Sequence, residues 1–375
     1  PLLGRTKDND KRVYGESIGS GSASFDGTDD YIDMGDMSTF STEGTVMMWV
    51  KITAGSADRA FISKYDASNN KREFMMQWGT DETVKWNVQP NPAAYSANYR
   101  AESSNALTNQ TWTHLAGTCK VGEKNKLYID GVLDAESSSN LADAVDDTDV
   151  SVFIGKYENT YFNIGNMAQV AIFNTRLTQG DITRISQKEY ADLTTSEKTS
   201  LISWWGLDEE YLPTELWDEN KTDADIWNQG GSDDDLDIRY SSTDKEFIIT
   251  HTSATTYADM YLTNAATSLN AKYNTLKTTM DVNSTYKMTF QAKVNTGTVG
   301  VTGTQSSASS TSVTATEYTD YEFYYETDSS VGYTDEYFRI QSLDAGEKIY
   351  IKNISVKKLQ VQDLHGSNHG SVSGA

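Results

Sequence analysis

Aromatic side chains in polar surroundings are the residues of this sequence best suited to contact a ligand. An aromatic ring can pack against the apolar face of a sugar, while neighbouring amides and carboxylates hydrogen-bond its hydroxyl groups. Tyr95 and Tyr99 lie in the polar stretch 90–105, and Tyr324 stands between two glutamates. Trp86 is a further candidate because the amide side chains of Asn87 and Gln89 follow it, although its position in the alternating pattern places it on the core face of the strand. The three tyrosines are therefore better candidates for sugar contact than Trp86.

Two groups of aspartates are candidates for binding calcium, which takes oxygen ligands from acidic loops. The first group is Asp26, Asp29 and Asp30, and the second contains Asp233 and Asp235. Aspartates in turns more often cap backbone N–H groups and face solvent. Calcium is thus the one cofactor for which the sequence offers candidates, and a chain without any cofactor is the stronger interpretation.

Residue patterns typical of catalysis are missing from the sequence. Retaining glycosidases need two carboxylates about 5 Å apart, and the acidic segment Glu215–Glu219 has the wrong spacing for such a pair. Cys119 and His114 lie five residues apart on one strand-like stretch, where we interpret both as buried packing residues. His365 and His369 would pair on a helix, but the glycines beside them favour a flexible tail. We therefore predict that the protein is not an enzyme.

The charge balance argues against several classes of partner. Lys and Arg number 31 against 54 Asp and Glu, a net charge of −23, and no basic run could neutralise successive phosphates. We expect no nucleic-acid partner. The apolar stretches span only a few residues, far below the roughly 20 that a membrane helix needs. We therefore expect no membrane partner either.

The elements that must position these residues are strands. Thr45–Ile52 alternates, so that every second residue of Val46–Ile52 shares one face. Phe74, Met76 and Trp78 predict one arm of a hairpin, and the alternating run 84–88 predicts the other. Strands with turns at this spacing favour a β-sandwich.

The second half of the chain alternates more cleanly. Tyr286–Val294 places every second residue on the core face, and Tyr321, Phe323 and Tyr325 do the same farther on. The hydrophobic phase shifts within Ile349–Val356, which predicts a bulge near Asn353. The small-residue stretch 296–316 fits either a polar strand pair or a mobile loop.

Helical signals are confined to one island. Thr178 and Thr194 each precede an acidic residue by three positions, a capping-box pattern that predicts one or two short helices near 178–200.

The residue composition changes along the chain and divides it into regions. All eight tryptophans lie at or before Trp227, and twelve acidic residues accumulate between Leu207 and Asp237. We predict five regions: an N-terminal arm over 1–14, a β-sandwich over 15–206, an acidic connector over 207–235, a second β-sandwich over 236–360 and a C-terminal tail over 361–375.

The first sandwich resembles the laminin-G-like, concanavalin-A-type jelly rolls, and the resemblance covers most of residues 15–206. The segments that carry it are Ser22–Ile32, Thr45–Lys51, Trp112–Thr118, Leu127–Gly131, Gly165–Asn174 and Leu201–Glu209. This family supports many functions, so the resemblance implies a fold rather than a ligand.

The second sandwich resembles the jelly-roll carbohydrate-binding modules found with glycan-degrading enzymes and in phage virion proteins. The similarity rests on Ser284–Val294, Tyr318–Phe323 and Ile349–Val356. In many laminin-G-like chains a segment similar to Asp363–Ala375 follows soon after the Trp-x-Leu-Asp-Glu segment, here Trp205–Glu209. Its position at the C-terminus suggests that the second jelly roll is an insertion.

These resemblances imply an all-β protein of two jelly-roll domains with a recognition role outside a cell. The first residues lack the apolar core of a secretory signal. We therefore expect a virion surface protein, a phage head decoration, tail or fibre component, that contacts other virion proteins and a host-surface glycan as a homo-oligomer. The alternatives are a secreted carbohydrate-binding accessory protein of a glycan-degrading system and a purely architectural capsid or tail protein.

Overall fold

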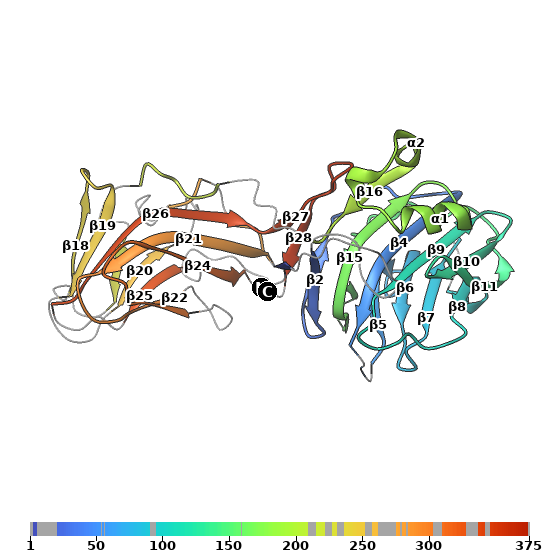
Figure 1. Ribbon diagram of the computed structural model, residues 1–375, viewed down its shortest axis with the longest axis horizontal. Helices are drawn as coiled ribbons and strands as arrows, with labels where there is room; N and C mark the ends of the chain where they lie inside the picture. The colour runs from blue at the N-terminus through green and yellow to red at the C-terminus, as the bar shows by residue number, and fades with distance from the viewer. Residues whose placement is uncertain are drawn as a thin grey trace. The chain divides into compact units, whose positions relative to one another are not determined.

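The computed structural model shows two units built mainly of antiparallel strands (Figure 1). The first unit contains residues 1–211 and 360–374, and the second contains 212–359. The structure describes residues 3–5, 21–53, 55, 57–90, 95–158, 160–208, 215–221, 227–230, 236–251, 257–261, 275–277, 280–282, 284–302, 310–327, 337–341 and 346–373. The all-β class predicted from the sequence is confirmed.

Two sheets of eight strands form the first unit. One sheet has the order β1-β2-β15-β4-β9-β10-β11, with β16 paired to β15; its strands are β1 Leu3–Arg5, β2 Gly21–Asp26, β4 Glu43–Ile52, β9 Thr113–Lys120, β10 Lys124–Ile129, β11 Val132–Asn140, β15 Ile164–Phe173 and β16 Leu201–Trp205. The other has the order β27-β28-β3-β12-β5-β6-β7-β8; its strands are β3 Tyr31–Asp33, β5 Arg59–Asp66, β6 Lys71–Trp78, β7 Val84–Val88, β8 Arg100–Glu102, β12 Phe153–Ile154, β27 Gln360–Val361 and β28 Gly370–Ser373.

The smaller elements of the first unit are a two-stranded hairpin and short helices. They are β13 Lys156–Tyr157, β14 Tyr161–Phe162, α1 Gln179–Ile185, α2 Thr195–Lys198 and the 3₁₀ turns η1 Ala97–Tyr99 and η2 Tyr190–Asp192.

The hairpin β6–β7 forms as predicted, with Met76 opposite Trp86 in the register. Six alternate side chains of the two strands are completely buried: Phe74, Met76, Trp78, Val84, Trp86 and Val88. Because side chains alternate between the two faces of a strand, residues such as Asn87 must point to the opposite face. The hairpin therefore has a core face and an outer face, and the outer face matters for the site below.

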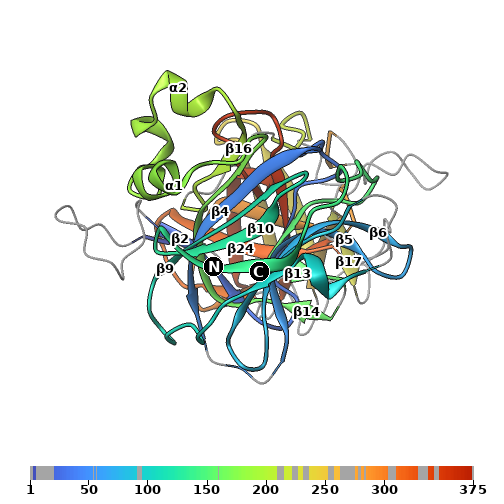
Figure 2. The same cartoon turned by 90° about the vertical axis from the view of Figure 1, so that its right-hand side faces the viewer.

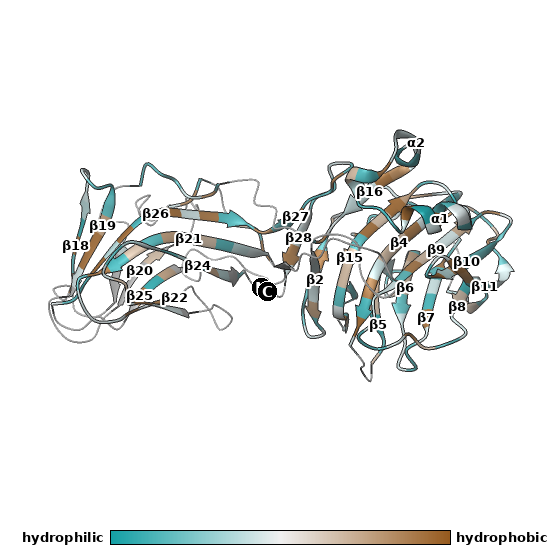
Figure 3. Cartoon of the chain, in the orientation of Figure 1, coloured by the Kyte–Doolittle hydropathy of each residue, from teal (hydrophilic) through white to brown (hydrophobic). Residues whose placement is uncertain are grey.

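Strand β4 departs from simple alternation, although the predicted core face is buried. Met47 and Trp49, on its other face, are also buried, at 2% and 3% exposure. Met47 packs in a cluster with residues of α1, and the indole Nε1 of Trp49 donates a hydrogen bond to the Ser186 carbonyl oxygen. Figure 3 shows the resulting hydrophobic stretches along β4 and β15.

The helical island caps this outer side of the sheet. Thr178 and Thr194 both form capping boxes, with Asp181 and Glu197 respectively, as the spacing predicted. Ile182 and Ile185 are the buried residues of α1. Figure 2 shows α1 and α2 together on one side of the first unit.

The C-terminal segment, expected as a tail over 361–375, contributes strands β27 and β28 to the first unit, where β28 pairs with β3. Asp363 is 2% exposed, and its Oδ1 accepts hydrogen bonds from the backbone N–H groups of Trp204 and His365. His369 Nδ1 accepts from the Asp363 N–H. These contacts anchor the segment to β16, so the second unit interrupts the first in the sequence.

Two sheets of five strands form the second unit. One has the order β17-β20-β25-β22-β23; its strands are β17 Trp227–Gly230, β20 Tyr257–Tyr261, β22 Val299–Thr302, β23 Ser310–Val313 and β25 Tyr337–Gln341. The other has the order β18-β19-β26-β21-β24; its strands are β18 Leu236–Ser241, β19 Glu246–His251, β21 Thr285–Val294, β24 Thr319–Glu326 and β26 Lys348–Lys358. Within 296–316, the described residues include the polar strand pair β22–β23.

The core face of β21 is buried as predicted, from Tyr286 to Val294 at every second residue. The predicted bulge is also confirmed. The register between β21 and β26 shifts after Thr289, and Asn353 has a φ of 52°. The shift lets Ile351 and Val356 both reach the core, at 0% exposure.

Part of the stretch expected as an acidic connector, 207–235, lies in the second unit. Leu216 and Trp217 are buried in its core, and β17 begins at Trp227. Glu215 accepts hydrogen bonds from the Val356 N–H at 2.9 Å. In the described part of the chain, no helix is long and apolar enough to cross a lipid bilayer.

Candidate functional site

A pocket of about 340 Å³ lies on the outer face of β5, β6 and β7, next to the β13–β14 hairpin. We call it the tyrosine pocket, and its described lining residues are Asp58, Arg59, Tyr65, Ala67, Arg72, Met75, Gln77, Asn87, Tyr95, Tyr157 and Tyr161. Met75, Gln77 and Asn87 line it because they alternate with the buried core residues of the same strands.

Three of the tyrosines form a continuous aromatic wall. The rings of Tyr157 and Tyr161 stack with centroids 5.1 Å apart, because the two residues are directly paired in the β13–β14 hairpin. Tyr65 meets Tyr157 edge-on at 5.3 Å. Such a wall has both an apolar face and hydroxyl groups, the combination that sugar rings require.

The hydroxyl groups of Tyr65 and Tyr157 stay protonated at neutral pH. Burial raises the pKa of Tyr65 to about 12, although the neighbouring Arg72 guanidinium acts in the opposite direction. Burial also raises the pKa of Tyr157, and Glu158 adds to the effect. Both phenols can therefore donate and accept hydrogen bonds.

Asn87 contributes an unpaired polar group to the pocket. Asn87 is 1% exposed, and among the described residues its amide oxygen Oδ1 has no hydrogen-bond partner. A buried carbonyl without a donor costs about 1–3 kcal/mol. The structure thus keeps a hydrogen-bond acceptor unsatisfied in the wall of an open pocket.

Tyr95, predicted from the sequence, lies in the same pocket at 43% exposure. Its loop is held by Gln89, whose Oε1 accepts from the Ser96 N–H at 3.0 Å and whose Nε2 donates to the Ser96 carbonyl at 3.2 Å. The Tyr95 hydroxyl lies 3.4 Å from Arg100 Nη1. The structure therefore brings this predicted residue together with Asn87.

The other predicted aromatic residues lie elsewhere. Trp86 is completely buried, and its Nε1 donates to the Thr118 carbonyl oxygen at 3.1 Å. Its ring is therefore a core residue with no face left for a ligand. Tyr99 is half-buried in η1 and is not among the described residues of the pocket wall. Tyr324 is half-buried on β24 of the second unit, with Lys287 Nζ 5.2 Å from its ring centre.

Sequence reasoning missed Tyr65, Tyr157 and Tyr161. The signal available was the alternation of β6 and β7, which assigns an outer face to residues such as Asn87. That signal does not say which loop or hairpin will cover the face. The tyrosines come from β5 and the β13–β14 hairpin, which sequence-distant pairing brings there.

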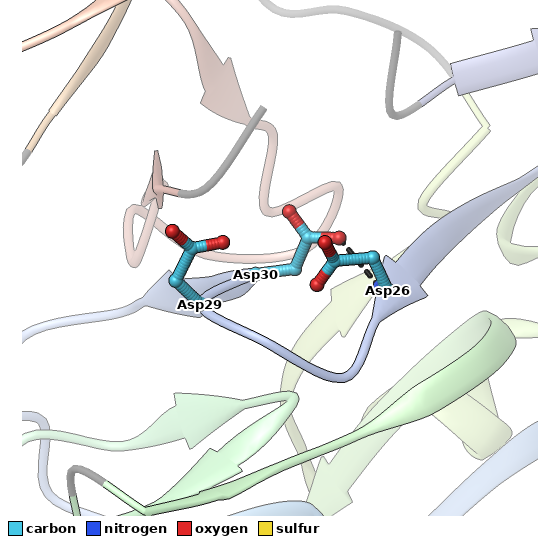
Figure 4. A group of neighbouring side chains, drawn as sticks. All are labelled: Asp26, Asp29 and Asp30. Carbon is cyan, nitrogen blue, oxygen red and sulfur yellow. Dashed lines mark hydrogen bonds between the residues drawn. The ribbon is translucent and has the colours of Figure 1, made fainter. Parts of the chain in front are cut away.

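The first aspartate group does gather in space (Figure 4). Carboxylate oxygens of Asp26, Asp29 and Asp30 lie within 4.8 Å of one another in the turn between β2 and β3. The Asp30 carboxylate accepts from the Asp26 N–H at 2.6 Å, and Asp26 accepts from the Thr28 N–H at 2.7 Å. These bonds are those of an acid-capped turn, and calcium binding there stays a prediction. Asp233 and Asp235, the second candidate group, lie outside the described residues.

Cys119 and His114 are buried packing residues, as predicted. Burial raises the pKa of the Cys119 thiol to about 12 and lowers the pKa of His114 to about 3. At neutral pH the thiol is protonated and the imidazole is uncharged, so neither serves the other as nucleophile or acid.

A hollow of about 380 Å³ also lies on the second unit, over β21, β24 and β26. We call it the Gln291 pocket, and its described lining residues are Thr289, Phe290, Gln291, Asp320, Tyr321, Glu322 and Asn353. Three of its polar side chains are bonded in a row: Asn353 Nδ2 donates to Gln291 Oε1 at 2.8 Å, and Gln291 Nε2 donates to Asp320 Oδ1 at 2.9 Å.

Comparison with known proteins agrees with this architecture. Residues 26–183 match the family described as the concanavalin A-like lectin/glucanases superfamily. The matched residues lie within the first unit, and the second unit is a further β-sandwich outside the match. No curated protein matches the chain.

Several solved structures are similar over part of the chain. A proposed carbohydrate-binding protein from Bacteroides ovatus has a TM-score of 0.41 and 15% identity, covering 52% of this chain and 54% of that one. Domain 4 of an extracellular arabinanase from Geobacillus stearothermophilus, solved with arabinotriose, has a TM-score of 0.35 and 19% identity over 49% of this chain and 86% of that one. A heptameric pentraxin from Limulus polyphemus has a TM-score of 0.35 and 15% identity over 44% of this chain and 80% of that one.

The chain spans about half the length of the Bacteroides ovatus protein. Similarity at this level describes the fold and does not define a ligand.

Proposed function

We propose that this protein is a non-enzymatic carbohydrate-binding protein and that the tyrosine pocket holds the sugar. The observation that carries the proposal is a pocket lined by four tyrosines, two of which stack with their ring centres 5.1 Å apart. The stacked rings of Tyr157 and Tyr161 offer the apolar contact, and the tyrosine hydroxyl groups and the Asn87 amide are polar groups of the same wall. The match of residues 26–183 to the family described as concanavalin A-like lectin/glucanases is compatible with a sugar ligand, although the fold alone does not define one.

Binding fits this pocket better than hydrolysis does. Glycoside hydrolysis generally uses two carboxylates that flank the scissile bond. In the described part of the pocket wall, Asp58 is the one carboxylate, and its Oδ1 accepts a hydrogen bond from the Thr80 N–H. A wall of tyrosines with a single carboxylate suits a protein that binds a sugar and releases it chemically unchanged.

The test is a glycan array followed by calorimetric titration of the strongest hit. Tyr161→Ala and Asn87→Leu are expected to weaken its affinity about tenfold or more, because each removes a contact that the pocket supplies. Tyr324→Ala is the matched control, since that tyrosine was an equal candidate in the sequence but lies in the second unit. Loss of affinity in Tyr324→Ala alone would move the site to the second unit.

We propose that the protein acts as a secreted accessory of a glycan-degrading system, since the lectin-type domain and the module-like second sandwich suit that setting. Mass spectrometry of the culture medium is the direct check. A virion surface protein, with other virion proteins as partners, was the first expectation from the sequence. If the chain is recovered in purified phage particles and is missing from particle-free medium, the secreted setting is wrong and the virion setting replaces it.

A further inference from the structure

Arg59 enters the tyrosine pocket from β5 and holds two neutral oxygens. Its Nη1 donates to the carbonyl oxygens of Phe162 at 2.7 Å and Gly27 at 3.1 Å. Its Nε is buried and has no hydrogen-bond partner in the described part of the chain. Burial lowers the pKa of Arg59, and the charge of Asp26 partly offsets the effect. The guanidinium thus keeps a positive charge at a place where burial penalises it.

Arg72 enters the same pocket from β6 in a similar way. It donates to the amide oxygen of Asn70 and, from Nη2, to the Ala67 carbonyl oxygen at 2.9 Å. Its guanidinium lies 5.6 Å from the ring centre of Tyr65. Its Nε is also buried, and no described residue bonds to it. Among the described residues, neither Arg72 nor Arg59 forms an ion pair with a carboxylate.

This arrangement is unusual for the chain. With 54 acidic residues against 31 basic ones, carboxylates are available over most of the surface. Arg100, Arg176, Arg184 and Arg239 all form ion pairs with Asp or Glu at 2.6 to 2.9 Å. The two pocket arginines instead contact neutral oxygens and a tyrosine ring. Among the described residues that line the pocket with these arginines, Asp58 is the one with an acidic side chain.

We propose that the tyrosine pocket selects a sugar that carries a carboxylate, an inference that rests on the sugar-binding function proposed above. The planar guanidinium fork matches the geometry of a carboxylate, and the pairing is strongest where water is partly excluded. Both arginines line the pocket, so a carboxylate bound there meets two guanidinium groups that carry positive charge. The tyrosine wall holds the sugar ring, and the arginines determine which ring is accepted.

The experiment uses the full chain and an array of paired probes. Oligosaccharides containing uronic or sialic acid are printed beside their methyl esters, which keep the ring and remove the charge, and sulfated sugars are printed beside their desulfated forms. The carboxylated member of a pair is expected to bind at least about tenfold more tightly than its ester, and its affinity is expected to fall with added salt.

Variants then assign the effect to the arginines. Arg72→Gln is expected to reduce affinity for the carboxylated probe about 10- to 100-fold while changing affinity for the ester less than about twofold. Arg72→Lys keeps the charge and is expected to restore part of the loss. Arg239→Gln, which removes a paired surface arginine of the second unit, is the control and is expected to leave binding unchanged.

The outcomes separate this inference from the function on which it rests. Binding of neutral glycans alone, with loss in Tyr161→Ala, overturns the selectivity and leaves sugar binding in place. Preference for sulfated probes over carboxylated ones also overturns it. An array without any bound glycan rejects both proposals.

Discussion

The tyrosine pocket and the Gln291 pocket are similar in size, but they differ in whether their polar side chains already have hydrogen-bond partners. The tyrosine pocket measures about 340 Å³ and the Gln291 pocket about 380 Å³. In the first, the Oδ1 of Asn87 and the Nε of Arg59 are buried without partners. In the second, Gln291 is bonded on both sides, to Asn353 and Asp320.

The difference teaches that volume alone is a poor guide to a binding site. A sheet face whose polar groups bond to one another gains little from a ligand, because each new bond replaces an existing one. The aromatic residues show the same contrast. Both pockets contain stacked rings, but Tyr321 of the Gln291 pocket is half-buried, whereas Tyr95 of the tyrosine pocket is 43% exposed.

The largest expected effect is a loss of stability when a large core side chain is removed from either unit. Trp86→Ala is expected to destabilise the first unit by about 3–5 kcal/mol, and Phe290→Ala to destabilise the second by a similar amount, because each opens a cavity beside its pocket. Hydrogen exchange read by mass spectrometry would localise each loss, to β6 and β7 in one variant and to β21 in the other. Equal loss of protection in both units of either variant would show that they unfold together.

Lowering the pH is expected to reduce the stability of the first unit through His114. Burial lowers the pKa of His114 to about 3 from an ordinary value of 6.5, so the unfolded state takes up a proton first as the pH falls. Stability is therefore lost below about pH 6.5, by about 2 kcal/mol at pH 5 from this residue. Burial raises the pKa of Glu246 in the second unit, which gives acidification the opposite sign there.

The measurement is urea unfolding of the wild type and of His114→Phe at pH 7 and pH 5. The phenyl ring keeps a contact with Trp49, whose ring centre lies 5.4 Å from the imidazole, and removes the proton. An unchanged pH dependence in this variant would argue against the assignment to His114.

The smallest of these effects concerns the bulge that shapes the Gln291 pocket. Asn353 has a φ of 52°, a left-handed conformation that a β-branched residue adopts at a cost. Asn353→Val is expected to destabilise the second unit by about 1–2 kcal/mol in urea unfolding. Asn353→Gly, which accepts this φ freely, is the matched control. Glycan affinity is expected to stay unchanged in both, and a weakened affinity would show that the second unit takes part in binding.

Local features were predictable from the sequence. The β6–β7 hairpin, the capping boxes at Thr178 and Thr194, and the bulge at Asn353 all formed where the residue pattern indicated. Tyr95, a candidate from the sequence, lies in the pocket that we propose as the site. Strand β4 was less predictable, because its second face is covered by residues far along the chain.

The sequence by itself determined the all-β class and the faces of its strands, since alternation and capping depend on residues a few positions apart. Only the tertiary structure decided which faces meet. Arg72 and Asn87 come from neighbouring strands, but Tyr157 and Tyr161 reach them from a hairpin some 70 residues farther on. Pairing over that distance depends on how whole sheets pack, so the pocket and its unpaired donors and acceptors exist only in the folded chain.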